Sequence, residues 1–132
     1  MFRVLITDGH AAYRQALREL LREQFPRIDV SEVSNFQQAL QQLDSLDLLL
    51  LDISLPQENG LLFAAKIKSE HPDLLICILS IHDAAEYRQA ALQHGADYFV
   101  SKGSPAEQIL RVLRTAIAGR QTHSPKRALS GS

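Results

Sequence analysis

The sequence contains a single cysteine, Cys77, among its 132 residues. One thiol cannot form a disulfide within the chain. Cys77 lies inside an apolar run, where a cysteine is typically a small buried hydrophobic residue of a protein from a reducing compartment.

Long apolar runs are also absent, and none reaches the length that spans a membrane. The first four residues lead directly into a strand pattern and do not resemble a signal peptide. Together with the single cysteine, these features predict a cytoplasmic protein with no membrane partner.

Neither sign of charge dominates, because 14 Lys and Arg residues stand against 15 Asp and Glu residues, for a net charge of -1. This balance gives no electrostatic argument for nucleic-acid binding by the chain itself. Hydrophobic residues make up 45% and charged residues 22%, as in an ordinary globular protein. The length is sufficient for one domain with one core.

What the chain does contain is an alternation of strand and helix patterns. We expect strands at 3–7, 28–33, 48–52, 74–80 and 97–100, and helices at about 12–21, 34–43, 61–70, 83–94 and 104–118. Ser34 and Gln37 form the capping-box pattern that opens the second helix. Five such units predict an α/β fold, a doubly wound parallel sheet covered on both faces.

The composition changes near the carboxyl end. Residues 121–132 are polar and basic, which indicates a linker or a truncated end. We therefore assign 1–120 to one domain and expect any further domain to lie outside this chain.

Asp52 is the most informative residue, since it ends the run of four leucines Leu48–Leu51. Such a run predicts a strand buried on both faces, and ligands of open α/β sheets bind at the carboxyl ends of the strands. Alone, Asp52 could equally well start a turn. However, Asp8, Ser80 and Lys102 lie at the ends of other predicted strands, so the four side chains should converge at one edge of the sheet.

Two carboxylates, a hydroxyl and an ammonium group suit a phosphoryl group together with a hard cation such as Mg²⁺. A carboxylate can act as a nucleophile and form an aspartyl-phosphate. We expect the Lys102 side chain to be partly exposed beside Asp8 and Asp52. The chain has no glycine-rich loop after the first strand, which argues against a flavin- or nucleotide-binding domain.

Residues 2–120 resemble the receiver domain of bacterial two-component response regulators. Residues 52–56 followed by Gly60 are similar to the phosphoacceptor segment, Leu79-Ser80 to the hydroxyl switch position, and residues 95–102 to the segment with the aromatic switch residue and the lysine. Within the family, the chain is most similar to regulators with a LuxR-type helix-turn-helix output domain. The residues that carry this second likeness are Asp8-Gly9-His10, Arg14, Ser80-Ile81-His82-Asp83, Glu86-Tyr87 and Lys102-Gly103.

The resemblance implies a flavodoxin-like sheet with strand order 2-1-3-4-5. It implies that Asp52 accepts a phosphoryl group from a sensor histidine kinase, assisted by Ser80 and Lys102, and that Ser80 and Phe99 switch conformation. The domain would control transcription through a DNA-binding output domain absent from this chain. It would be a signalling domain rather than an enzyme, although it would assist its own phosphorylation and dephosphorylation.

Gly9 departs from the family pattern, because a second acid usually stands at this position and coordinates the cation directly. The implied ligands of Mg²⁺ are then Asp8, Asp52 and the backbone carbonyl of Ser54, and we expect weak binding. Gly9 also supports an alternative, a pseudo-receiver that acts as a phosphorylation-independent interaction or dimerisation module; the sequence leaves a homodimer open. We interpret His10, beside the pocket, as a positioning residue rather than a catalytic one.

Overall fold

The computed structural model describes residues 1–53, 59–82 and 84–130, with side chains up to Arg120. Five parallel strands form one sheet in the order β2-β1-β3-β4-β5, which confirms the predicted fold class and strand order. The strands are β1 (Arg3–Thr7), β2 (Asp29–Val33), β3 (Leu48–Asp52), β4 (Leu75–Ser80) and β5 (Tyr98–Ser101). The helices are α1 (Ala11–Gln24), α2 (Phe36–Leu40), α3 (Gly60–Glu70), α4 (Ala85–Gln93) and α5 (Ala106–Ser130).

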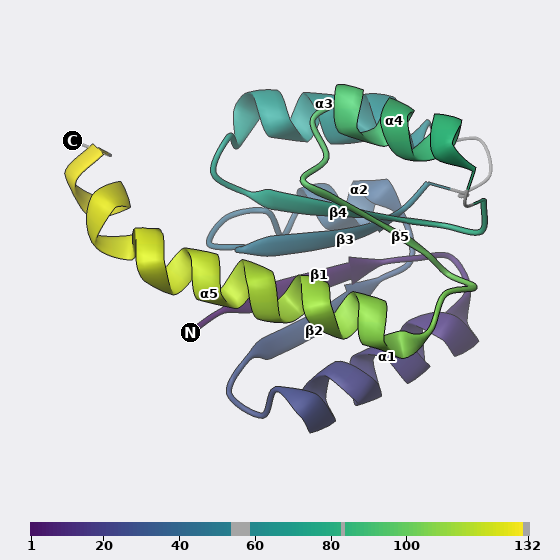
Figure 1. Ribbon diagram of the computed structural model, residues 1–132, viewed down its shortest axis with the longest axis horizontal. Helices are drawn as coiled ribbons and strands as arrows, with labels where there is room; N and C mark the ends of the chain where they lie inside the picture. The colour runs from purple at the N-terminus through teal and green to yellow at the C-terminus, as the bar shows by residue number, and fades with distance from the viewer. Residues whose placement is uncertain (54–58, 83, 131–132) are drawn as a thin grey trace.

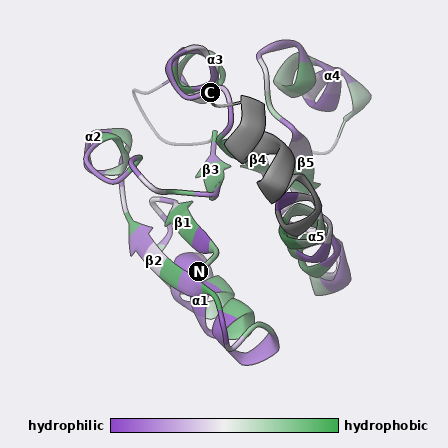
Figure 2. Cartoon of the chain, turned by 90° about the vertical axis from the view of Figure 1, so that its left-hand side faces the viewer, coloured by the Kyte–Doolittle hydropathy of each residue, from purple (hydrophilic) through white to green (hydrophobic). Residues whose placement is uncertain are grey.

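Helices cover both faces of the sheet. Figure 1 shows α1 and α5 on one face and α2, α3 and α4 on the other. Figure 2 shows hydrophobic (green) and hydrophilic (purple) residues along each helix, and the buried apolar residues of α1 and α5 and those of α2, α3 and α4 belong to the two cores on either side of the sheet. Among the described residues, no helix is both long and apolar enough to cross a membrane.

The leucine run in β3 explains why helices cover both faces of the sheet. Successive side chains of a strand point to opposite faces, so Leu48 and Leu50 pack against α1 and α5, while Leu49 and Leu51 pack against α2 and α3. All four leucines are completely buried. Because β3 is the central strand, both cores depend on it.

The second helix begins one residue later than the capping pattern predicted. Its N-cap is Asn35, whose side chain accepts a hydrogen bond from the backbone N–H of Gln38, and the Gln38 side chain accepts one from the N–H of Ser34. The expected pairing of Ser34 with Gln37 is therefore wrong. Asn caps a helix as well as Ser does, so the sequence offers two starting points and the packing of the helix selects one.

The last helix is longer than expected: its predicted end near residue 118 is wrong, since α5 continues to Ser130. Gly119 ends a helix only when it takes a left-handed conformation, and the glycine described with a positive φ is Gly95 instead. The assignment of 121–132 to a linker toward a further domain stays a prediction.

The residue that directly follows β3 lies very close to the start of α3. A Cβ atom built on Gly60 would lie 2.6 Å from Cγ2 and 2.7 Å from Cα of Ile53, the residue directly after Asp52. Only glycine fits this approach without moving the backbone that follows the strand.

We therefore expect Gly60→Ala to lower the free energy of unfolding by about 1–3 kcal/mol, because the added methyl group overpacks the contact with Ile53. Gly119→Ala is the matched control: nothing lies within 4 Å of its Cβ position inside α5. It should raise the free energy of unfolding by about 0.5–1 kcal/mol. Urea unfolding of both variants measures these changes, and equal effects of the two substitutions would contradict the close approach.

Candidate functional site

The four residues predicted at the strand ends lie at one edge of the sheet. Asp8 directly follows β1, Asp52 ends β3, Ser80 ends β4 and Lys102 directly follows β5. The register explains this alignment, since Thr7 pairs with Leu51 and Asp52 with Leu79, so the ends of β1, β3 and β4 are level. Asp8, Asp52 and Ser80 are all completely buried.

Lys102 joins the two acids. Its ammonium nitrogen lies 2.6 Å from Oδ2 of Asp8 and 3.1 Å from Oδ2 of Asp52. Its side chain is only 8% exposed, while the residue as a whole is partly exposed, as expected. The ammonium nitrogen also lies over the ring of Tyr13 on α1, 4.6 Å from the ring centroid. A buried carboxylate pair with one buried cation is a strongly coupled unit, and its members cannot be replaced independently.

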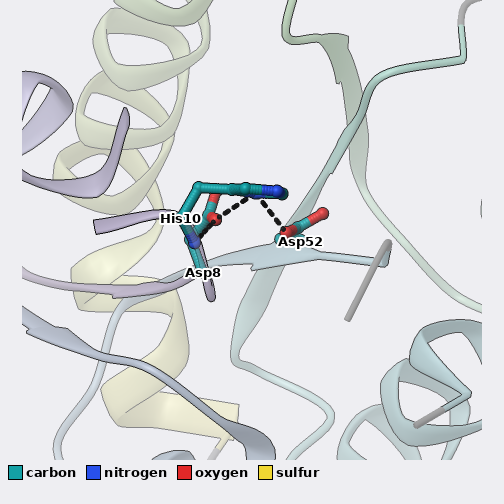
Figure 3. A group of neighbouring side chains, drawn as sticks. All are labelled: Asp8, His10 and Asp52. Atoms are coloured by element: carbon teal, nitrogen blue, oxygen red, sulfur yellow. Dashed lines mark hydrogen bonds and ion pairs between the residues drawn. The ribbon is translucent and has the colours of Figure 1, made fainter. Parts of the chain in front are cut away.

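His10 completes the cluster from the loop between β1 and α1. Its Nδ1 lies 3.2 Å from Oδ1 of Asp8, 3.7 Å from Oδ2 of Asp52 and 3.2 Å from the ammonium nitrogen of Lys102. The imidazole ring extends across the two carboxylates (Figure 3). Among the described residues, Asp8, His10 and Asp52 are the group whose ligand atoms could hold a metal ion, all within 4.8 Å of one another.

The chain forms a tight turn that places His10 there. The backbone N–H of His10 donates to Oδ1 of Asp8 at 2.7 Å, so the aspartate closes the turn with its own side chain. Arg14 fixes the same loop from α1: it donates to the backbone carbonyl of Asp8 at 2.7 Å and pairs with Glu32 at 2.6 Å. Sequence reasoning treated His10 only as a positioning residue; its place two positions after Asp8, in a turn, was the available signal.

The polar groups of the site perturb the neighbouring Tyr13. Burial, followed by the charge of Asp8, raises the pKa of its hydroxyl to about 12. The phenol therefore stays neutral at physiological pH and cannot add a further negative charge beside the acids. Burial also raises the pKa of the Cys77 thiol, on the strand beneath, which makes that cysteine an unreactive core residue, as predicted.

Ser80 ends β4 and Phe99 lies in β5. The Ser80 hydroxyl accepts a hydrogen bond of 3.0 Å from the backbone N–H of His82. The Phe99 ring is buried, 6% exposed, and the guanidinium of Arg88 from α4 lies 4.9 Å from its centroid. Arg88 also donates to the backbone carbonyl of Phe99 at 3.4 Å. These contacts connect α4 to β5 next to the acidic site.

Two further expectations concern the ligands of the cation. Ser54, expected to contribute a backbone carbonyl, lies outside the described residues. Gly9 is exposed and brings no side-chain ligand, so the described cation ligands come from Asp8, Asp52 and His10.

Comparison with known proteins identifies the arrangement. Residues 4–114 match the family model of the response regulator receiver domain. The chain is 30% identical over 122 residues to the glycerol metabolism activator of Pseudomonas putida; the match covers 90% of this chain but 55% of that protein. The chain thus spans about half the length of that relative.

Solved structures share the fold. A LuxR family DNA-binding response regulator from Silicibacter pomeroyi superposes with a TM-score of 0.78 and 25% identity, covering 90% of this chain and 93% of that one. A response regulator from Thermotoga maritima, in complex with Mg²⁺–BeF, superposes with a TM-score of 0.77 and 26% identity, covering 88% and 99%. The chain belongs to the family of response regulator receiver domains, and its relatives include regulators of the LuxR family.

Proposed function

We propose that Asp52 accepts a phosphoryl group and that this charge controls an output domain. The observation that carries the proposal is the buried contact of Lys102 with both Asp8 and Asp52 at the carboxyl edge of the sheet. A carboxylate held beside a fixed cation is suited to receive a phosphoryl group, because the cation stabilises the charge that accumulates on the phosphoryl oxygens.

The chemistry is a transfer between two nucleophiles. The Asp52 carboxylate attacks the phosphorus atom of a phosphohistidine on a sensor histidine kinase. The P–O bond to Asp52 forms as the P–N bond breaks, and the kinase histidine keeps the electron pair of that bond and takes up a proton. Lys102 then pairs with a phosphoryl oxygen, and the Ser80 hydroxyl turns from the N–H of His82 to donate to another.

A divalent cation would assist by neutralising the phosphoryl oxygens. Asp8 and Asp52 supply the buried carboxylate oxygens that such an ion takes, so the described residues fit a cation, with one acid fewer than the family pattern because of Gly9. Water and, as the resemblance implies, the Ser54 carbonyl would complete the coordination. We infer weak Mg²⁺ binding.

The response would pass through Phe99 and α4. Movement of Ser80 toward the phosphoryl group changes the space beside Phe99, and the ring is held by Arg88 of α4. Repacking of this ring would shift the populations of α4 positions, in the way a local charge biases a two-state element. In the full-length protein, this surface would act on a DNA-binding domain. Gly9 favours one other function, a phosphorylation-independent interaction module.

The first test is the site of phosphorylation. We expect acetyl phosphate to add one phosphoryl group to the wild type, slowly, and none to Asp52→Asn, as measured by intact mass. Asp44→Asn, which removes an exposed acid elsewhere, is the control and should react like the wild type. An adduct on Asp52→Asn would contradict the assignment, while no adduct on any form would favour the interaction module.

The second test concerns Gly9. Gly9→Asp should raise the affinity for Mg²⁺ roughly 10–100-fold, because one added charged ligand contributes about 1.5–3 kcal/mol. Gly119→Asp makes the same charge change on α5 and should have no effect. Chemical-shift titration of the three forms measures this affinity. If the wild type already binds Mg²⁺ as tightly as Gly9→Asp, the missing acid is compensated and the account of the site is wrong.

The third test concerns Lys102. Its removal leaves two buried carboxylates without their shared cation, so we expect Lys102→Ala to lower the free energy of unfolding by about 3–5 kcal/mol. The loss should be smaller in an Asp8→Asn background, where a single charge remains. Lys66→Ala, an exposed lysine, should change little. Urea unfolding measures stability, and the beryllofluoride-induced shift of the Phe99 resonances measures switching in the variants that stay folded.

An unchanged stability of Lys102→Ala would mean that the ammonium group is not needed to hold the two acids. If the Phe99 resonances still shift with beryllofluoride in the double variant Asp8→Asn, Lys102→Ala, then Lys102 is not needed for the conformational switch.

A further inference from the structure

We propose that Asp8, His10 and Asp52 form a site for a divalent transition-metal ion, with Nδ1 of His10 as a direct ligand. This inference rests on the proposed function, because it assigns the identity of the cation at the same site. It differs from the weak Mg²⁺ site in having a third side-chain ligand, the imidazole nitrogen of His10.

The spacing of the ligand atoms supports this proposal. Nδ1 lies 3.2 Å from Oδ1 of Asp8 and 3.7 Å from Oδ2 of Asp52 (Figure 3). Ligands that bind one metal at about 2.0–2.2 Å lie roughly 3–3.5 Å apart in octahedral or tetrahedral geometry. Both distances to Nδ1 are therefore within a few tenths of an ångström of this range, and the two carboxylate oxygens, which lie within 4.8 Å of each other, complete the group.

The second, independent observation is the cation already held by these side chains. The Lys102 ammonium nitrogen lies 2.6 Å from Asp8, 3.1 Å from Asp52 and 3.2 Å from Nδ1 of His10. It thus contacts the same three residues that would bind the metal. A positive charge is stabilised at this point by two completely buried carboxylates, and a divalent ion gains more from them than a single ammonium group does.

Neither protonation state of Nδ1 suits all of the charged groups around His10. If Nδ1 carries a proton, it donates to the carboxylates but faces the Lys102 ammonium group; if Nδ1 carries a lone pair, it accepts from Lys102 but faces carboxylate oxygens. A metal ion resolves this conflict, since the lone pairs of Nδ1 and of both carboxylates can then point to the same positive centre. Lys102 would move aside and pair with the outer carboxylate oxygens.

The ligand set determines the class of metal. Imidazole suits Zn²⁺, Co²⁺, Ni²⁺ and other transition metals, whereas Mg²⁺ prefers oxygen ligands and retains water. The imidazole of His10 is 63% exposed, so the side of the ion opposite the sheet stays open to water or to a phosphoryl oxygen. Gly9 contributes to this selectivity, because no carboxylate competes there for a hard cation.

The test uses Co²⁺ and Mg²⁺ alone, without a phosphodonor. Isothermal titration measures the affinity of the wild type, His10→Ala and His71→Ala, a control that removes a histidine at the carboxyl end of α3. The visible absorption of Co²⁺ reports whether nitrogen enters its coordination. All titrations use protein whose fold is verified by circular dichroism.

We expect His10→Ala to weaken Co²⁺ binding by roughly 10–100-fold, at least as much as the loss of a supporting ligand contact does. Its Mg²⁺ affinity should change less than about twofold, since Mg²⁺ relies on oxygen ligands. His71→Ala should match the wild type for both ions.

Equal Co²⁺ affinity in His10→Ala and wild type would overturn the proposal, as would the absence of Co²⁺ binding by the wild type or an equal loss in His71→Ala. Phosphorylation of Asp52 is measured separately by mass. A failure of this metal assignment therefore leaves that result unchanged, and an unphosphorylated Asp52 leaves the metal titration valid.

Discussion

The structure of the site depends on the burial of two carboxylates beside one ammonium group. Asp8 and Asp52 are completely inaccessible to solvent and their ligand atoms lie within 4.8 Å. At an effective dielectric constant of about 20, their mutual repulsion is on the order of 3 kcal/mol. Lys102, at 2.6 and 3.1 Å from the two acids, contributes attraction that exceeds this repulsion. Additional positive charge, or conversion of one carboxylate into an acyl phosphate, would therefore rearrange the whole cluster.

The sheet imposes this cluster on the side chains. The central strand β3 is buried on both faces by its leucines, so the backbone at Asp52 cannot move to relieve the repulsion. Ile53, the residue after Asp52, lies against Gly60 at the start of α3. The repulsion between the carboxylates can thus be reduced mainly by movement of the loops after β1, β4 and β5. Those loops carry His10, His82 and Lys102.

Strong local patterns made most of the fold predictable. Period and length fixed the strands, and β1 and β3 have the predicted bounds, because buried parallel strands leave a continuous apolar run. The four strand-end residues were also predictable, since a parallel sheet brings its carboxyl ends together. The helix ends were less predictable. Ser34 and Asn35 are both good N-cap residues, so the start of α2 was ambiguous. Gly119 would end a helix only in a left-handed conformation, which depends on tertiary contacts. The contact of Lys102 with the ring of Tyr13 on α1 was not predictable, because no local pattern encodes it.

The exchange of an acid for glycine and the presence of His10 have one physical explanation. Each carboxylate added to a buried cluster raises its repulsion, and with Gly9 the site holds two acids against one lysine, where a third acid would add a further negative charge. An imidazole can then approach the acids at a distance that a third carboxylate could not maintain without a metal ion. Such a site would depend less on a bound cation at rest, and it could still recruit one when a phosphoryl group adds negative charge. The same arrangement that would weaken binding of a hard ion would therefore supply a nitrogen ligand of the kind that a softer ion prefers.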